Sequence, residues 1–206
     1  MNKPDSPFRN AKQRDEERAA KRYAVLHAAV QMFNERGFHA TSLDDVAASL
    51  GISKPTIYHY LGNKDQVLLE CLTMGLRQIV AAADAAHGED GTGLDRLKAF
   101  LRRYAAVNMD EFGRCVIRTS DESLAPESVV RFHALKREVD RAMRKLIAEG
   151  IADGSIADTD PMMLAFTLAG AVNWTARWYD PAGRLSASDV AARMVDVLTN
   201  GIAPRI

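Results

Sequence analysis

The sequence predicts an all-α protein in two parts: an N-terminal three-helix unit built on a helix-turn-helix, and a longer helical domain that follows it. Three observations predict this fold class. Apolar residues recur at the spacing of one helix face in nearly every segment, and no segment alternates apolar and polar residues as a half-buried strand does. Residues 41–64 fit two short helices joined by a tight turn. One segment near the C-terminus is apolar on nearly every side, as a buried helix is.

The chain is expected to divide into three regions. Residues 1–17 carry two prolines and many charges without an apolar period, which predicts a mobile charged arm. Residues 18–65 hold the helix-turn-helix domain, and residues 66–206 form the second helical domain. The net charge is zero, yet seven Lys or Arg face four acids over residues 1–22, beside the helix-turn-helix. This basic surplus suits the phosphates of a nucleic acid; the alternative is a solvated arm that only keeps the chain soluble.

The first unit is predicted from its capping residues and turns. Its first helix covers residues 18–36, with an apolar face at helical spacing and a glycine at its end. Thr41 or Ser42 can cap the next helix, because a carboxylate follows three residues later in either register. Gly51 ends that helix, and a second short helix carries Pro55 in its first turn, where the missing N–H costs nothing.

The second domain is predicted to contain six helices, all bounded by capping residues, glycines or prolines. They cover residues 64–86, 94–108, 109–119, 126–150, 162–179 and 188–200. The helix over 109–119 is short and is weakened by a glycine. One face of the 126–150 helix is basic, and we interpret it as a solvated face rather than a second nucleic-acid site; its cations are Arg131, Lys136, Arg137, Arg141, Arg144 and Lys145.

The helix-turn-helix also carries a family signature. Three runs resemble the signature of the TetR family of bacterial one-component regulators: Thr-Ser-Leu-Asp-Asp-Val-Ala, Gly-Ile-Ser-Lys-Pro-Thr-Ile-Tyr and Asn-Lys, all between residues 41 and 64. Residues 28–38 are similar to that family's first helix and its closing turn, so the match is dense over about residues 22–70. Leu61 departs from the pattern, because the family often has an aromatic residue there. We expect this to cost some packing but not the fold.

The second helix of a helix-turn-helix is the one that enters the major groove of DNA. Lysine in its first turn can donate to guanine, and threonine or proline can touch a thymine methyl group. Tyrosine, histidine and lysine further along can reach phosphates, although Tyr58 and Tyr60 could instead pack against the first helix. Together with the resemblance, these arguments give nine candidate DNA-binding residues: Thr41, Ser42, Lys54, Pro55, Thr56, Tyr58, His59, Tyr60 and Lys64.

The resemblance implies that a small molecule binds inside the second domain. Candidate lining residues are Tyr104, Asn108, Phe112, Arg118, Phe132, His133, Asn173, Trp174 and Arg177. For each of them, ordinary core packing or a surface position is the alternative. Asn173 stands out, because an amide in an apolar helix needs a ligand or a neighbouring helix as its partner.

The segment over residues 170–186 resembles TetR members that control fatty-acid, steroid or aromatic-acid catabolism, a group that often senses acyl-CoA thioesters. On that implication, Arg118, Arg177 or Arg184 would hold the CoA phosphates.

These expectations describe a transcription regulator, most simply a repressor. It would bind a palindromic operator in double-stranded DNA as a homodimer formed through its two C-terminal helices, and a small-molecule effector would release it. The alternative is a constitutive DNA-binding or architectural protein without an effector. No nucleophile elbow, P-loop, dinucleotide fingerprint or HExxH occurs, so we expect no enzyme, cofactor or metal.

The sequence also predicts where the protein works. Cys71 and Cys115 lie far apart, no signal peptide is visible, and no run approaches the roughly 18 apolar residues of a membrane span. We therefore expect a cytoplasmic protein with free thiols.

Overall fold

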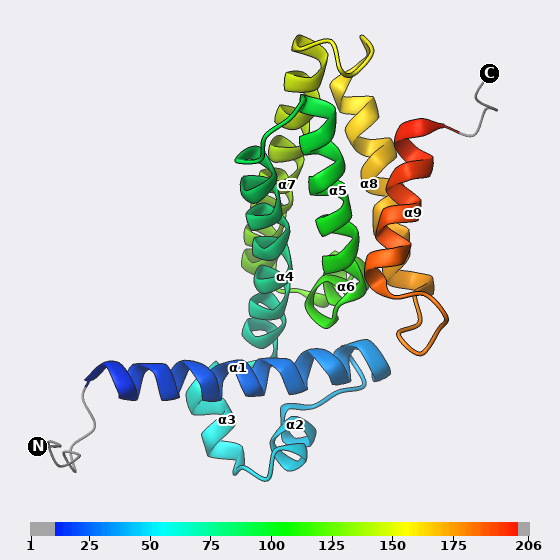
Figure 1. Cartoon of the computed structure of the whole chain (residues 1–206). Helices are drawn as coiled ribbons and strands as arrows, with labels where there is room; N and C mark the ends of the chain where they lie inside the picture. The colour runs from blue at the N-terminus through cyan, green and yellow to red at the C-terminus, as the bar shows by residue number, and fades with distance from the viewer. Residues whose placement is uncertain (1–10, 202–206) are drawn as a thin grey trace, which may run out of the picture.

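The structure is a computed structural model that describes residues 11–201; residues 1–10 and 202–206 lie outside the described range. Over that range the chain forms nine α-helices and one short 3₁₀ turn, and it contains no strand (Figure 1). The helices are α1 (Ala11–Arg36), α2 (Leu43–Ser49), α3 (Lys54–Leu61), α4 (Lys64–His87), α5 (Gly93–Met109), α6 (Glu111–Arg118), α7 (Pro126–Ala152), α8 (Pro161–Trp178) and α9 (Ala187–Asn200), with the 3₁₀ turn at Asp121–Ser123. The predicted all-α fold is confirmed.

The N-terminal unit consists of α1, α2 and α3. Figure 1 shows α1 lying across the lower end of the helix bundle, with α2 and α3 on the side away from it. Val46, Ile57 and Leu61 are buried against α1, so the aliphatic Leu61 fills a core position. The predicted arm over residues 1–17 needs correction: residues 11–17 belong to α1, and its other ten residues lie outside the described range. Charged residues favour helix at this spacing, as the Lys12–Glu16 ion pair at 3.9 Å illustrates.

Four helix starts carry a reciprocal capping box, in which a side chain accepts from a backbone N–H three residues on and receives one in return. The pairs are Ser42–Asp45, Asn63–Gln66, Thr92–Asp95 and Ser186–Asp189. The structure therefore decides the alternative left open by the sequence: Ser42, not Thr41, caps α2. The hydrogen bonds from these Ser and Thr hydroxyls hold the pKa of Asp45, Asp95 and Asp189 below the ordinary value.

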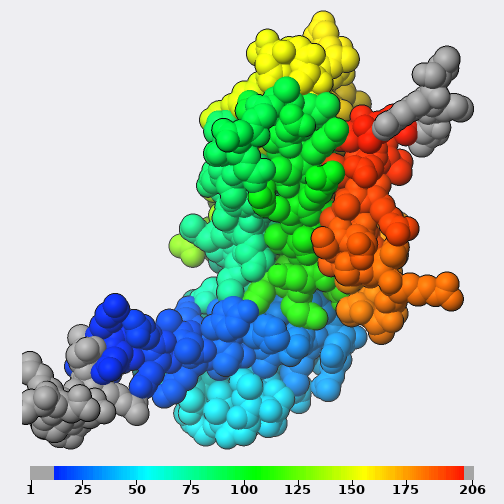
Figure 2. All heavy atoms as spheres, in the orientation of Figure 1, coloured from blue at the N-terminus to red at the C-terminus, as the bar shows by residue number. Residues whose placement is uncertain are grey.

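The C-terminal domain is built around α5, which contacts α4, α6, α7, α8 and α9. Its fully buried side chains Phe100 and Leu101 pack with Phe132 and Ile147 of α7. In the views of Figures 1 and 2, α8 and α9 form one outer side of the bundle. The N-terminal unit lies below it, so that only the lower ends of the bundle helices meet that unit.

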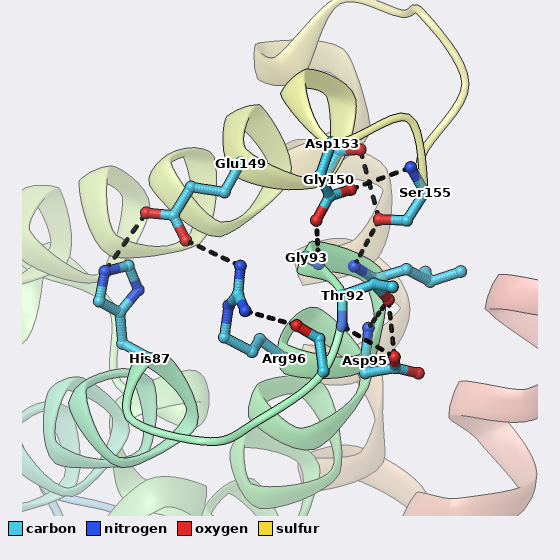
Figure 3. A network of polar contacts seen from close by, with 11 residues as sticks. His87, Thr92, Gly93, Asp95, Arg96, Glu149, Gly150, Asp153 and Ser155 are labelled. Carbon is cyan, nitrogen blue, oxygen red and sulfur yellow. Dashed lines mark hydrogen bonds and ion pairs between the residues drawn. The ribbon is translucent and has the colours of Figure 1, made fainter.

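The end of the bundle farthest from α2 and α3 is held by a dense polar cluster (Figure 3). The Asp153 carboxylate accepts from the Gly93 N–H at 2.6 Å, and the Ser155 hydroxyl accepts from Leu94 N–H at 3.0 Å. A Cβ atom on Gly93 would overlap the backbone of Gly150, so the start of α5 and the end of α7 are in direct backbone contact. We call this arrangement the distal clasp.

Two apolar helices, α8 and α4, differ from what the sequence predicts when the single chain is considered. The helix over residues 162–179 was expected to be buried on every side, but Met163, Phe166, Trp174 and Trp178 of α8 are exposed in the single chain. No run was expected to approach a membrane span, yet α4 is long and apolar enough by length and composition. Because 56% of its apolar window is buried inside the bundle, α4 has the character of a core helix.

Candidate functional site

The first candidate surface is the exposed face of α3. Ile57 and Leu61 are buried toward the core, whereas Lys54, Pro55 and Tyr58 lie on the outside of the same helix. Tyr58 is 51% exposed, so its ring is available to a partner. Helix α3 therefore has one buried face and one exposed face. It lies at the end of the molecule opposite the distal clasp (Figure 1).

Polar contacts fix the first turn of this helix. The ammonium group of Lys54 pairs with the carboxylate of Asp44 on α2, and this hydrogen bond raises the pKa of Lys54. The hydroxyls of Ser53 and Thr56 lie 2.8 Å apart. Pro55 occupies the first turn and needs no N–H partner there. Lys54 is therefore paired with α2 while its side chain stays 67% exposed.

Tyr60 and Lys64 occupy the junction of α3 and α4. Tyr60 is half-buried and packs against the core, so of the two tyrosines it is Tyr58 that is free. The Lys64 Nζ lies 4.2 Å from the centre of the Phe38 ring and 3.5 Å from the carbonyl oxygen of His39. Partial burial lowers the pKa of Lys64.

The side chain of Thr41 faces inward, so its hydroxyl is not placed for the predicted DNA contact. Thr41 is only 2% exposed, and its hydroxyl lies 3.2 Å from the Met32 carbonyl and 3.0 Å from the Gly37 carbonyl. Its hydroxyl thus holds the end of α1 rather than facing outward. Ser42 remains exposed, but its hydroxyl is engaged with Asp45 in the capping box.

The second candidate site is a cavity of about 660 Å³ inside the C-terminal domain. Helices α4, α5, α6, α7 and α8 all contribute to its walls. The lining residues are Leu76, Tyr104, Val116, Ile117, Thr119, His133, Lys136, Arg137, Val139, Asp140, Met143, Arg144, Ala165, Phe166, Ala169 and Asn173. Apolar walls with a few polar groups are typical of ligand sites, and this volume suits a small organic molecule.

One wall of the cavity carries a neutral polar network. Asn173 Oδ1 accepts from the Tyr104 hydroxyl at 2.9 Å and from Asn108 Nδ2 at 3.1 Å. Burial raises the pKa of Tyr104 to about 12, so its hydroxyl keeps its proton at neutral pH. With Oδ1 occupied, the Asn173 NH₂ group has no hydrogen-bond partner among the described residues and is available to a ligand acceptor.

The basic side chains on the α7 wall of the cavity differ in whether a carboxylate pairs with them. The Asp121 carboxylate lies 2.6 Å from His133 and 3.9 Å from Lys136, and Arg144 pairs with Asp140 at 2.7 Å. Arg137 has no carboxylate partner within the part of the chain that the structure describes. An anionic ligand entering the cavity would therefore meet Arg137 without displacing an ion pair.

Comparison with known proteins bears on both sites. The family description "Tetracyclin repressor-like, C-terminal domain" matches residues 90–202, more than half of the chain, and "Bacterial regulatory proteins, tetR family" matches residues 25–71. The chain belongs to the TetR family. It is therefore a member of a family of DNA-binding transcriptional regulators, with α2 and α3 inside the matched N-terminal part and most of the cavity wall inside the matched C-terminal part.

Individual TetR members resemble the whole chain. The HTH-type transcriptional repressor KstR2 of Mycolicibacterium smegmatis is 28% identical over 207 residues, covering 97% of this chain and 95% of the relative. The crystal structure of PfmR from Thermus thermophilus has a TM-score of 0.81 and 27% identity, and covers 87% of this chain and 99% of that one. AibR, solved in complex with isovaleryl coenzyme A and operator DNA, shares the fold with a TM-score of 0.76 at 24% identity, covering 87% of this chain and 98% of that one.

Within this TetR fold, three of the predicted lining residues, Tyr104, His133 and Asn173, line the cavity, and the other six do not. Asn108, Phe112 and Phe132 are buried in the core without lining the cavity, and Trp174 is 64% exposed on the outer face of α8. The two arginines bond to backbone carbonyls instead. The sequence analysis missed Lys136, Arg137 and Arg144 as lining residues, because it interpreted the basic face of α7 as wholly solvated.

Arg118 and Arg177 join helices rather than line the cavity. Arg118 donates from Nε to the Ala176 carbonyl at 3.0 Å and from Nη1 to the Asn34 carbonyl at 3.3 Å. Arg177 donates to the Ile117 carbonyl at 3.3 Å. Arg118 thus connects the end of α1 with α8, across α6. In this TetR chain, Arg118 of α6 therefore links the N-terminal unit to the C-terminal domain.

Proposed function

We propose that this TetR-family regulator is a repressor that binds a palindromic operator as a homodimer and leaves it when an effector fills the C-terminal cavity. The observation that carries the proposal is that one chain combines an exposed α3 face with a cavity of about 660 Å³ whose walls include α4, the helix that begins directly after α3. A constitutive DNA-binding protein, the second candidate, has no need of such a cavity.

For operator recognition we assign two sets of contacts. Lys54, Pro55 and Thr56, in the first turn of α3, are placed to meet base edges. Tyr58, His59 and Lys64 have donors suited to phosphate oxygens, which position a protein without reading sequence. Tyr60 is proposed as a lesser phosphate contact, because its ring is half-buried.

We infer that the dimer forms through α8 and α9. Met162, Phe166, Trp174 and Trp178 of α8 are exposed at four-residue spacing and so lie along one ridge of the helix. Gly170 occupies the middle position of that ridge, and nothing in its own chain lies within 4 Å of where its Cβ would be. A second helix can approach closely there. Val197, exposed on α9, extends the same kind of apolar surface.

For the effector we propose an amphipathic anion, of which an acyl-CoA thioester is the leading candidate. The apolar walls suit a hydrocarbon chain, the Asn173 NH₂ group suits a carbonyl oxygen, and Arg137 suits a phosphate or carboxylate. The solved complex of AibR with isovaleryl coenzyme A supports this class. Because Arg118 and Arg177 bond to backbone carbonyls, Arg137 replaces them, and Arg184, as the proposed phosphate contact.

Coupling between cavity and operator is assigned to the first two residues of α4. Lys64 contacts Phe38 and His39 of the N-terminal unit, whereas Asp65 accepts from the start of α7, whose later turns line the cavity. A ligand that moves α7 therefore acts on α4 at the point where α4 meets the DNA-binding unit. Such a two-state element is what effector release requires.

Selection of bound sequences from random duplex DNA tests the proposal. We expect a motif with dyad symmetry and half-sites separated by about one helical turn or a multiple of it. The selected duplex is then titrated with protein in the presence of free fatty acids and of their CoA thioesters. Loss of operator affinity with one class supports release of the operator by that class of effector. Recovery of no motif, at any salt concentration, contradicts the repressor assignment.

A further inference from the structure

The first turns of α1 form a groove with the end of α3, and the side chains that α1 contributes to this groove have no role in the proposed reading of DNA by α3. The groove has a volume of about 270 Å³. Its lining consists of Arg14, Glu17, Arg18, Lys21, His59 and Tyr60. Figures 1 and 2 show that this part of α1 projects past the bundle, so that α3 is its nearest neighbour in the fold.

The three cations of the groove are a regular feature of α1. Arg14, Arg18 and Lys21 follow the i, i+4, i+7 spacing of one helix face. The same face continues into Val25 and Ala29, which are buried against the N-terminal core. The stripe therefore points toward the side on which α1 packs against α2 and α3. All three cations are exposed.

A fixed contact forms the inner end of the groove. The Arg22 guanidinium donates to the Tyr60 carbonyl and pairs with the Glu70 carboxylate, which holds α1 against the last turn of α3. The edge of the His59 ring meets the Tyr60 ring, with centroids 5.6 Å apart. The groove therefore presents ammonium, guanidinium, imidazole and phenol groups from two helices held in one arrangement, with Glu17 as its only lining carboxylate.

We propose that this groove binds the phosphodiester backbone of DNA that flanks the sequence read by α3, an inference that rests on the proposed DNA binding. Seven residues of helix rise about 10 Å from Arg14 to Lys21. Phosphates on one strand follow each other at about 3.4 Å along the duplex axis, so the stripe spans about three of them. Phosphate contacts position a protein without reading sequence, so the groove would lengthen the DNA footprint of each subunit while leaving sequence preference to α3.

The test is the salt dependence of binding to a labelled mixed-sequence duplex of roughly four helical turns, about 40 base pairs. The Arg14→Ala/Arg18→Ala/Lys21→Ala variant should flatten the plot of log affinity against log salt by about two to three units for each bound subunit, and so by about five units for a bound dimer, since each lost phosphate contact contributes about 0.9. The matched control is Arg131→Ala/Arg141→Ala/Lys145→Ala, which removes the same charge from exposed positions on α7. It should leave the slope within about half a unit of the wild type.

Circular dichroism and the comparison of the salt slopes separate the outcomes. Alanine is favourable in helices, so circular dichroism should show an unchanged helix content in both triple variants. If the wild-type protein and the α1 variant bind the duplex with the same salt slope, the groove assignment is wrong. Operator recognition by α3 is not affected by that result. Wild-type protein that binds no duplex at low salt overturns the proposed function as well. An equal loss of slope in both triple variants also overturns the groove, because the effect then reflects net charge alone.

Discussion

The Asp65 carboxylate accepts a hydrogen bond from the Ser128 hydroxyl at 2.6 Å, although the two residues stand 63 positions apart in the chain. The other carboxylate oxygen accepts from the Ala125 N–H at 2.7 Å. Ala125 precedes α7 and supplies no side-chain cap of its own. Asp65 therefore caps α7 from a different helix, and its negative charge lies at the positive end of the α7 dipole.

Replacing Asp65 with alanine should lower the free energy of unfolding by about 1–2 kcal/mol, because α7 loses its cap and two donors lose their acceptor. Urea denaturation followed by circular dichroism measures this. Asp84→Ala removes an exposed carboxylate from the same helix and should change stability by less than about 0.5 kcal/mol. Equal effects from the two variants would contradict the capping role.

Thr41→Val and Lys64→Ala should affect different properties. The buried Thr41 hydroxyl binds backbone carbonyls, so its loss should cost about 1 kcal/mol of stability without changing the salt slope of DNA binding. Lys64→Ala should weaken all duplex sequences about equally and flatten the slope by about one unit. Fluorescence anisotropy at several salt concentrations makes the comparison. A flatter slope in Thr41→Val would restore Thr41 as a phosphate contact.

Gly170→Leu should convert the proposed dimer to a monomer while leaving the subunit folded. The side chain has free space within its own chain, and leucine favours helix over glycine by up to about 1 kcal/mol. Added bulk in the middle of the α8 ridge would hold a partner helix away. Sedimentation at micromolar concentration reports the mass. Ala81→Leu adds similar bulk to an exposed position on α4 and should leave the dimer intact.

Arg137→Gln should weaken binding of isovaleryl-CoA and of longer acyl-CoA thioesters by about tenfold or more, as expected when a charge-assisted hydrogen bond worth roughly 1.5–3 kcal/mol is lost. Isothermal calorimetry provides the measurement. Arg141→Gln, an exposed cation of the same helix outside the cavity lining, is the matched control. A wild-type protein that gives no heat with any thioester argues against an acyl-CoA effector.

Stability should be constant near neutral pH and should fall at acid pH. Hydrogen bonds from Ser42, Thr92, Ser155 and Ser186 hold the pKa of their partner aspartates below the ordinary value of 3.8. The folded state therefore binds fewer protons than the unfolded state, and this contribution is complete above pH 3.8 and is lost as the pH falls through the lowered values. Urea midpoints between about pH 5 and pH 2 measure it. Asp189→Asn should show a shallower decline.

The sequence was sufficient wherever the relevant interactions are local. Caps at Ser42, Asn63 and Ser186 depend on residues three positions apart, so the helix starts could be predicted closely. The inward turn of the Thr41 side chain depends on carbonyls from the end of α1, and the extent of α1 itself depends on charged residues that favour helix without an apolar period. Neither effect is visible in a hydrophobic pattern.

A ligand site with polar groups in the C-terminal domain could be predicted from the sequence, but most of the residues that line the cavity could not. Asn173 was identifiable because an amide is unusual in an apolar helix, and its partners Tyr104 and Asn108 were among the candidates. Arg118 and Arg137 have the same side chain, however, and only the packing of α6 and α7 decides which one meets a carbonyl and which one faces the cavity. Two residues of the same type can thus have different roles because of their positions in the tertiary structure, and the spacing of apolar residues in the sequence does not reveal those positions.

The distal clasp has a mechanical consequence. The hydrogen bonds of the Gly93 and Leu94 N–H groups to Asp153 and Ser155 hold the start of α5 against the end of α7, and the absence of side chains on Gly93 and Gly150 lets the two backbones touch (Figure 3). The opposite end of α7 is capped by the Asp65 carboxylate, from the first turn of α4. Helix α7 is therefore anchored to α5 at one end and to α4 at the other, so any rearrangement of its middle turns, which line the cavity, must be accommodated between these two anchors.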